Sequence, residues 1–280
     1  MRRFSDEALP LGKEAVSSCL AASGVEPADV GLLTVVTCTG YANPGLDVML
    51  ARDLGMAPSV ERVQVGHMGC YAALPGLAVV ADAAAARAKT AVLLCVELSS
   101  LHAQPPSDDD GQTVAHALFS DAAAAVVVRP GGPGLEVVDI AARTDPAHSE
   151  LLRWDITDHG FRLRLSPELP SAIEPHVAPM VGELLAANGL RPSDVAAWAV
   201  HPGGPRIVDK VGERLSLDED ALRPTRAVLA AHGNCSSPTV LLVLERILAQ
   251  GDLHDGDYAV CLAFGAGLTL YAALLRRKVA

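Results

Sequence analysis

A cysteine, a histidine and an asparagine in this chain stand where they could act together in nucleophilic catalysis. Cys70 and Asn234 each follow a glycine and precede a long apolar segment of helical character, and His201 ends an apolar run before a Pro-Gly-Gly turn. Free N–H groups at a helix N-terminus stabilise a thiolate, and a neighbouring imidazolium lowers the pKa of a thiol further. An amide and an imidazole can also hold a developing oxyanion or enolate. We therefore expect a thiol nucleophile beside a polar site for the negative charge that develops on the substrate.

Each of these residues alone has a simpler structural interpretation. A cysteine in an Ala-rich helix is usually a core residue, and an asparagine after a glycine often caps a helix. A histidine before a Pro-containing turn is most often a residue of the strand end or of the surface. A functional interpretation is favoured here because the three positions are related by an internal repeat.

The repeat joins residues 20–35, LAASGVEPADVGLLTV, to residues 185–200, LAANGLRPSDVAAWAV, at an offset of 165 positions with eight of sixteen residues identical. In each copy an apolar-periodic helix ends at a glycine suited to the left-handed cap, Gly24 or Gly189. A proline, an Asp-Val pair and a short apolar strand then follow. Asn234 stands 164 positions beyond Cys70, close to the repeat offset. We expect the two helix N-termini to face one another with His201 between them.

Strands alternate with helices in the same order in both halves of the chain. This spacing predicts an α/β protein with two similar halves, residues 1–130 and 131–280, which meet at a turn over residues 130–133. The predicted helices are 8–22, 47–54 and 71–89 in the first half, and 172–187, 207–215 and 238–250 in the second. The predicted strands are 62–65, 90–96 and 122–128 in the first half, and 227–229, 258–263 and 268–274 in the second.

Composition and charge exclude several classes of protein. The net charge is −11 and no basic block is present, which argues against nucleic acid or an anionic membrane surface as the main partner. The apolar runs are too short to span a bilayer, and the first ten residues lack the apolar core of a signal peptide, so we expect a cytoplasmic protein. The six scattered cysteines are expected to be reduced thiols. We expect no metal site, and we interpret residues 105–112, with acidic residues 108–110, as an exposed solvated loop.

Five motifs resemble one known family. They are residues 65–77 (VGHMGCYAALPGL), 117–129 (ALFSDAAAAVVVR), 201–204 (HPGG), 232–249 (HGNCSSPTVLLVLERILA) and 264–271 (FGAGLTLY). In this order they resemble the type III polyketide synthases, the chalcone and stilbene synthase-like enzymes, over nearly the whole chain. The resemblance implies a thiolase-like fold of two pseudo-duplicated α/β halves with mixed sheets. The family's N-terminal stretch has no counterpart before Met1, so the first half is expected to be N-terminally truncated.

The resemblance also implies an activity. Cys70 would take a starter acyl group from an acyl-CoA, and His201 and Asn234 would stabilise the oxyanion and promote decarboxylation of malonyl-CoA. The resulting enolate would attack the acyl group in a Claisen condensation, repeated before cyclisation to pyrone- or resorcinol-type products. The family uses CoA thioesters as substrates, needs no metal or other cofactor, and acts as a homodimer.

Further site residues follow from the same resemblance. Phe119 matches the aromatic gate between the CoA tunnel and the cavity, and Asn43 matches a position that reaches across the dimer interface. The remaining substrate-binding positions that the resemblance implies are Cys38, Thr39, His102, Leu163 and Ser236.

Two alternatives stay open from the sequence. One is a ketoacyl-ACP synthase III-like condensing enzyme, which a basic docking face for an acidic carrier would favour. The other is a truncated, non-catalytic thiolase-fold protein, since basic residues that contact the CoA phosphates belong to the family's N-terminal stretch. The alternative without catalysis predicts that replacing Cys70 by alanine has no consequence. The Ala-rich, aromatic-poor composition favours an aliphatic starter.

Overall fold

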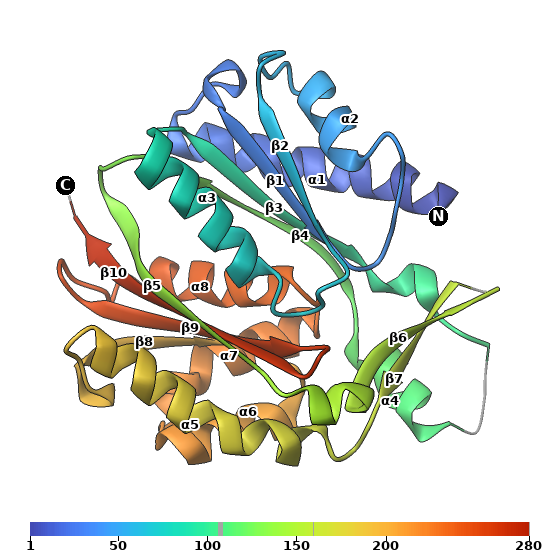
Figure 1. Cartoon of the computed structure of the whole chain (residues 1–280), viewed down its shortest axis with the longest axis vertical. Helices are drawn as coiled ribbons and strands as arrows, with labels where there is room; N and C mark the ends of the chain where they lie inside the picture. Colours follow the sequence, from blue (N-terminus) through green and yellow to red (C-terminus); the bar gives the residue numbers. More distant parts are fainter. Residues whose placement is uncertain (106–108, 159, 280) are drawn as a thin grey trace.

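A computed structural model describes residues 1–105, 109–158 and 160–279. Its first half contains four helices, two short 3₁₀ turns and four strands (Figure 1). In chain order they are α1 (Arg2–Ser23), η1 (Pro27–Asp29), β1 (Leu32–Thr37), α2 (Leu46–Asp53), β2 (Glu61–Gly66), α3 (Ala73–Arg87), β3 (Ala91–Leu98), η2 (Ser99–His102), α4 (Asp110–Leu118) and β4 (Asp121–Val128).

The second half begins after the turn that follows β4. Its elements in chain order are β5 (Gly134–Thr144), η3 (Pro146–Leu151), β6 (Leu152–Thr157), β7 (Gly160–Leu165), α5 (Leu169–Ala187), η4 (Pro192–Asp194), β8 (Val195–Val200), α6 (Pro205–Leu215), α7 (Glu219–His232), α8 (Pro238–Gln250), β9 (Tyr258–Gly265) and β10 (Thr269–Lys278).

Each half is built on a mixed four-stranded sheet, as the sequence predicted. The first has the strand order β2-β1-β3-β4, with β1 parallel to β2 and β3, and β4 antiparallel to β3. The second has the order β5-β10-β9-β8, in which only the β8–β9 pair is parallel. Strands β6 and β7 form a separate antiparallel hairpin.

Helices α3 and α8 lie between the two sheets, α1 covers the outer face of the first sheet and α5 that of the second (Figure 1). One core cluster joins α3 and α8 to strands of both sheets. Both helices are apolar around most of their circumference because each has a sheet on two sides. The closest approach is at Gly76, where an added Cβ would lie 2.8 Å from Leu93 Cδ1 and 2.9 Å from Val36 Cγ2.

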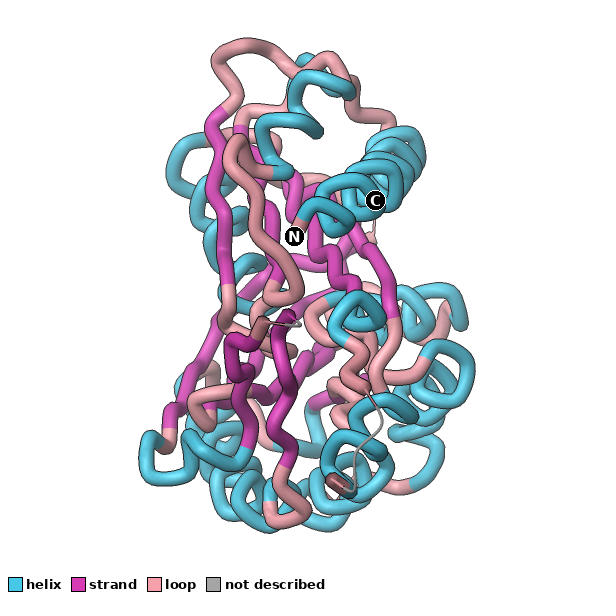
Figure 2. The backbone as a smooth tube through the Cα atoms, turned by 90° about the vertical axis from the view of Figure 1, so that its right-hand side faces the viewer, coloured by secondary structure: helices cyan, strands magenta, loops and turns pink. Residues whose placement is uncertain are grey.

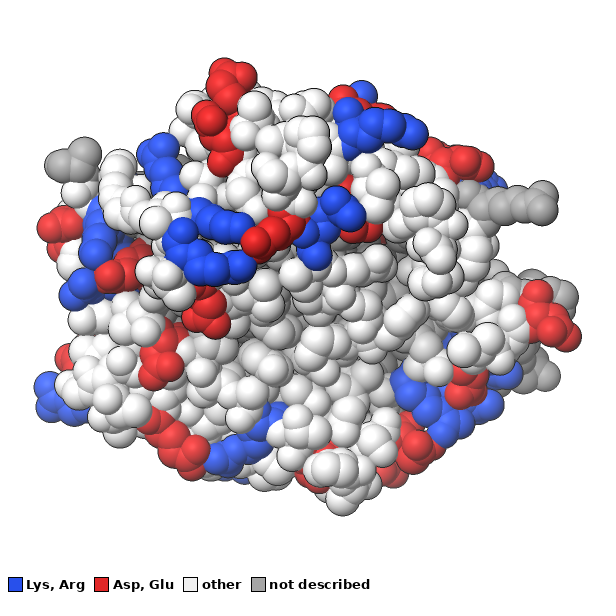
Figure 3. Space-filling model, turned by 45° about the horizontal axis from the view of Figure 1, so that its top comes forward, with Lys and Arg blue, Asp and Glu red and all other residues white. Residues whose placement is uncertain are grey.

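The repeated segment folds alike in both halves. Helix α1 is followed by β1, and α5 by β8, and each helix is followed by a glycine with positive φ, 64° at Gly24 and 72° at Gly189. Seen from the side, the two halves stack one above the other (Figure 2). On the face in Figure 3, basic and acidic side chains intermingle around a broad uncharged centre.

Two predictions of local structure were wrong. Residues 227–229 are not a strand but part of α7, whose buried Leu222, Thr225 and Val228 recur with helical spacing. A three-residue apolar run is too short to establish a period of two. Helix α4 begins at Asp110 inside the predicted loop, and the Asp109 side chain caps it by accepting from the N–H of Gly111. Residues 106–108 lie outside the described residues.

All six cysteines are free thiols in this structure. Within the described residues, no helix has both the length and the apolar character needed to cross a membrane. Nor does the described part of the chain hold a group of three or more His, Cys, Asp and Glu side chains arranged for a metal ion.

Gly40 and Gly182 should respond in opposite directions to alanine. An added Cβ at Gly40 would lie 2.0 Å from Cγ of buried Phe4, so Gly40→Ala is expected to destabilise the protein by about 2 kcal/mol through overpacking. Gly182, inside α5, has open space around its Cβ position, and Gly182→Ala is expected to stabilise by about 0.5–1 kcal/mol. Urea unfolding of both variants checks this, and equal effects would contradict the packing at Gly40.

Candidate functional site

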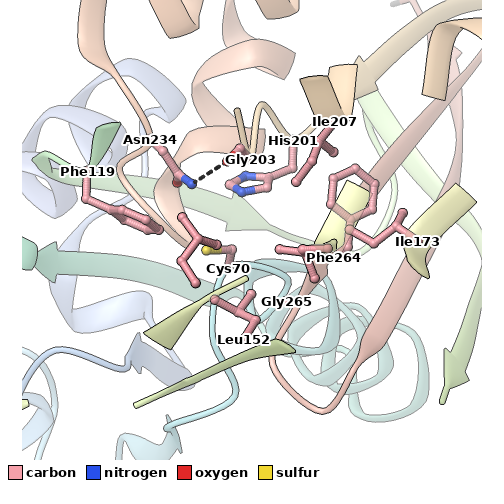
Figure 4. Close-up of a pocket in the computed structure, with 12 residues that line it drawn as sticks. Cys70, Phe119, Leu152, Ile173, His201, Gly203, Ile207, Asn234, Phe264 and Gly265 are labelled. Atoms are coloured by element: carbon pink, nitrogen blue, oxygen red, sulfur yellow. Dashed lines mark hydrogen bonds between the residues drawn. The ribbon is translucent and has the colours of Figure 1, made fainter. Parts of the chain in front are cut away.

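The thiol, imidazole and amide singled out by the sequence line one pocket (Figure 4). Cys70 comes from the turn before α3, His201 directly follows β8, and Asn234 lies between α7 and α8. Both halves therefore contribute to a single site. The other lining residues are Phe119, Leu152, Leu165, Leu169, Ile173, Gly203, Ile207, Phe264 and Gly265.

Two glycine-containing turns meet at Cys70. Gly69 has a φ of 96°, and an added Cβ there would lie 3.4 Å from the backbone nitrogen of Ala266. An added Cβ on Gly265 would lie 3.0 Å from the backbone nitrogen of Cys70 and equally close to the ring of Tyr71. The close approach of these two backbones fixes the position of the Cys70 thiol just before α3. Any side chain at Gly265 would push the two turns apart.

His201 is completely buried, and its backbone extends β8 by donating to the carbonyl of Leu262 at 2.7 Å. Its ring meets Phe264 edge to face, with 6.0 Å between the ring centroids. Neither ring nitrogen has a hydrogen-bond partner among the described residues. Burial lowers the pKa of His201 to about 3, so the imidazole is neutral at physiological pH. It can therefore accept a proton or donate one to a molecule in the pocket.

The amide of Asn234 is oriented by its neighbours. Its Oδ1 accepts from the backbone N–H of Ser236 at 2.8 Å, and its Nδ2 lies 3.5 Å from the carbonyl oxygen of Gly203 (Figure 4). The Asn234 backbone forms a parallel bridge with Phe119, donating to the carbonyl of Leu118 at 2.8 Å. Because Oδ1 is occupied on the protein side, the NH₂ group is the part of the amide available to a ligand.

The environment of Cys70 differs from the expectation in one respect. Burial raises the pKa of the Cys70 thiol to about 12, although hydrogen bonds with Ser236 and Asn234 act in the opposite direction. The expected lowering of the thiol pKa is thus wrong. The physical reason is that His201 is neutral, so the site has no imidazolium to offset the loss of hydration.

A buried carboxylate that sequence reasoning missed lies beside this site. Glu97 is completely buried; its Oε2 accepts from the Cys38 N–H at 2.9 Å and from the Thr39 hydroxyl at 2.8 Å. Its Oε1 accepts from the Ser237 hydroxyl at 2.7 Å, which joins the first half to the start of α8. Burial raises the pKa of Glu97. An acidic residue inside the otherwise apolar run 91–98 was the signal available in the sequence.

The implied substrate-binding residues take different places. Phe119 lines the pocket, whereas Asn43 lies on an exposed loop before α2. Cys38 and Ser236 are buried next to Cys70, with Cys38 Sγ 3.5 Å from Ser236 Oγ. The other three implied residues are Thr39, His102 and Leu163. They lie outside the lining of the described pocket, and each takes part in a hydrogen bond.

The neutral state of His201 should be measurable as a pH dependence of stability. Its pKa is about 3 in the folded protein and ordinarily 6.5, so the unfolded chain binds the proton more tightly and stability falls as the pH drops below 6.5. Between pH 7.5 and 5.5 this loss is about 1.4 kcal/mol. His201→Gln should lose that much less over the same interval, measured by urea unfolding.

The exposed His254 provides the control, since its side chain is 85% accessible. His254→Gln should retain the pH dependence of the parent protein. If His201→Gln and the parent protein lost the same free energy on acidification, the imidazole would not be held neutral by burial.

Comparison with known proteins identifies two matching family models. The model for the N-terminal domain of chalcone and stilbene synthases matches residues 3–132, and the model for their C-terminal domain matches residues 136–279. Together they cover nearly the whole chain.

Individual relatives also match nearly the whole chain. A 1,3,6,8-tetrahydroxynaphthalene synthase of Streptomyces peucetius subsp. caesius is 38% identical over 96% of this chain and 73% of its own length. A 3,5-dihydroxyphenylacetyl-CoA synthase of Streptomyces toyocaensis is 37% identical over 96% of this chain and 72% of its own length. The crystal structure of the 1,3,6,8-tetrahydroxynaphthalene synthase of Streptomyces coelicolor A3(2), a bacterial type III polyketide synthase, superposes with a TM-score of 0.95 at 28% identity, covering 100% of this chain and 80% of that one. These likenesses confirm the thiolase-like α/β fold expected from the sequence.

Proposed function

Because the chain belongs to the chalcone and stilbene synthase family and is a type III polyketide synthase, an acyltransferase, we propose that Cys70 is its nucleophile, with His201 and Asn234 as its partners. Both matched models describe chalcone and stilbene synthases, which decides against the ketoacyl-ACP synthase alternative. The roles of the individual residues rest on their geometry.

The roles of Cys70, His201 and Asn234 are assigned from one observation. Three side chains from separate elements of both halves reach one pocket, and the buried imidazole among them has no hydrogen-bond partner within the described residues. An unpartnered buried polar group costs free energy and calls for an explanation. A hydrogen bond from the imidazole to a substrate oxygen or to the thiol during the reaction provides one.

In the acylation step, the Cys70 sulfur attacks the carbonyl carbon of an acyl-CoA while His201 accepts the thiol proton. The oxyanion that forms receives a hydrogen bond from the Asn234 NH₂ group, which is preorganised by Ser236. Collapse breaks the bond to the CoA sulfur, which leaves with the proton held by His201. The acyl group is then a thioester of Cys70.

In the extension step, malonyl-CoA occupies the same pocket and loses its carboxylate as CO₂. The enolate oxygen left behind is held by Asn234 and the imidazole N–H of His201, where the low dielectric of the pocket strengthens each hydrogen bond. The enolate carbon attacks the Cys70 thioester, so a carbon–carbon bond forms and the thiolate is released and reprotonated. Repetition followed by cyclisation gives pyrone- or resorcinol-type products.

The pocket walls favour an aliphatic starter. Apart from the three catalytic candidates, the lining consists of Leu, Ile, Phe and Gly residues, which contact hydrocarbon well and offer a phenolic hydroxyl no side-chain partner. The proposed chemistry uses CoA thioesters as substrates and needs no further cofactor, since thiol, imidazole and amide supply its nucleophile, base and oxyanion donors. We place the enzyme in the cytoplasm.

Intact-protein mass spectrometry after incubation with acyl-CoAs tests this function. The parent protein should gain one acyl group, more readily from butyryl-, hexanoyl- or octanoyl-CoA than from 4-coumaroyl-CoA, and Cys70→Ala should gain none. His201→Gln should be acylated about 100-fold more slowly, because the base is lost. Malonyl-CoA added to the acylated protein should release polyketide products.

Cys261→Ala is the matched control, since Cys261 is a buried thiol that belongs to the hydrophobic core and not to the pocket lining. It should be acylated like the parent protein. An adduct that persists in Cys70→Ala would remove Cys70 as the nucleophile, and folded protein without any adduct would support the non-catalytic alternative.

We also propose that a second copy of the chain covers β2. Within the described residues, β2 pairs only with β1, and its side chains are mostly exposed. Exposed apolar side chains lie on β2 itself (Val63), on α2 (Val48) and in the loop between β1 and α2 (Tyr41), and Asn43 lies on that same loop. An unprotected edge strand with apolar neighbours is a surface that a partner strand can complete. This arrangement supports a homodimer in which Asn43 faces the interface.

Light scattering after size-exclusion chromatography tests the dimer. The parent protein should have twice the mass of one chain at micromolar concentration, and Val63→Asp should shift it toward the monomer by placing an unpaired charge in the interface. Val114→Asp, at an even more exposed apolar position on α4, is the control and should remain dimeric. A dimer unaffected by Val63→Asp would place the interface elsewhere.

A further inference from the structure

The β6–β7 hairpin stands apart from both main sheets, yet it forms part of the pocket wall. It is a two-stranded sheet of six residues in each strand, and it supplies Leu152 and Leu165 to the lining. A two-stranded hairpin is marginally stable by itself, so its position depends on contacts with the rest of the protein. Whatever holds the hairpin also sets the shape of the pocket.

Side chains from the segment before and into α4 occupy the edge of β7 that β6 leaves open. The Phe161 N–H donates to His102 Nδ1 at 3.1 Å, and the Phe161 carbonyl accepts from Gln104 Nε2 at 3.2 Å. The Leu163 carbonyl accepts from Nε2 of the buried Gln112. These bonds take the place of a third strand.

His102 also forms a hydrogen bond outside the hairpin, through its second ring nitrogen. Its Nε2 lies 2.5 Å from the carbonyl oxygen of Thr39, so Nε2 carries the hydrogen and Nδ1 is left as the acceptor for Phe161. Its ring stacks on Phe161 with 4.7 Å between centroids and meets Trp154 edge to face at 5.7 Å. An added Cβ at Gly160 would lie 3.0 Å from His102 Nδ1, and the φ of Gly160 is 105°.

From Thr39 the connection continues to the catalytic residues. The Thr39 hydroxyl donates to Glu97, and Glu97 accepts from Ser237, the N-cap residue of α8, which lies three residues after Asn234. Each link is buried, so each bond is shielded from competition with water. A continuous chain of hydrogen bonds therefore runs from the hairpin to the loop that presents the Asn234 amide.

We propose that His102 is a positioning residue that fixes the β6–β7 hairpin against the Thr39 turn and thereby determines which acyl chains the pocket accepts. This inference rests on the proposed function for the identity of the ligand, but the anchoring itself does not. The imidazole suits the task because one ring supplies an acceptor, a donor and an aromatic face at fixed angles. His102 acts on the pocket wall through its contacts with Phe161 of β7. It takes no part in the bond-forming steps.

Two substitutions separate the contributions of the ring. His102→Phe keeps the stacking on Phe161 and Trp154 and removes both hydrogen bonds, while His102→Gln keeps one donor and one acceptor. Gln104→Ala weakens the same β7 edge without touching the ring and serves if the phenylalanine variant does not fold. His254→Ala, at an exposed histidine, is the control.

Hydrogen–deuterium exchange of the peptide covering β6 and β7 is the first measurement, since it needs no substrate. Exchange should be about tenfold faster in His102→Phe and about threefold faster in Gln104→Ala, and unchanged in His254→Ala, as expected for the loss of buried hydrogen bonds. Unchanged exchange in the two anchor variants would overturn the anchoring, whether or not the protein is a synthase with Cys70 as nucleophile.

Steady-state kinetics with saturated acyl-CoAs of four to twelve carbons is the second measurement. His102→Phe should raise KM about tenfold for the preferred starter and flatten the dependence on chain length, with kcat changed less than threefold, and His102→Gln should recover most of the parent selectivity. An equal fall in kcat for all chain lengths would overturn the role in selectivity. Absence of turnover and of Cys70 adducts in the parent protein itself would count against the proposed function and leave the exchange result standing.

Discussion

The burial of α3 and α8 between two sheets is the constraint on which the rest of the structure depends. Each helix must be apolar on two sides, and small side chains such as Gly76 allow the sheets to approach. Because the repeat relates the two helices, their N-terminal ends meet near the middle of the molecule. The turns that lead into them carry Cys70 and Asn234, so the packing of the core also assembles the site.

Burial at this place decides the charge states of the site. Loss of hydration keeps the Cys70 thiol protonated and His201 neutral. A thiolate–imidazolium pair is disfavoured here because the buried pocket offers little hydration to either charge. Glu97 tolerates the same environment because four groups from both halves donate hydrogen bonds to it.

The pocket wall is held differently from the three candidate catalytic residues. Cys70, His201 and Asn234 are placed by turns at the ends of core elements, where the backbone is held on several sides. The β6–β7 hairpin is held at one edge by side chains, chiefly those of His102, Gln104 and Gln112. The shape of the wall therefore depends on side-chain hydrogen bonds, whereas the positions of the three candidate residues depend on the backbone of the core.

The sequence alone determined the alternation of elements, the duplicated halves and the choice of Cys70, His201 and Asn234 as candidate catalytic residues, because these rest on local patterns of period, glycine caps and motif order. Only the tertiary structure decided that Glu97 joins the halves, that α7 is a helix through residues 227–229, and that the thiol pKa is raised. It also showed the hydrogen bonds by which His102 and the Leu163 carbonyl hold a hairpin. The partners of Glu97 and His102 and the burial of Cys70 are contacts between residues distant in the chain, and the spacing of residues along the sequence does not show which distant residues meet.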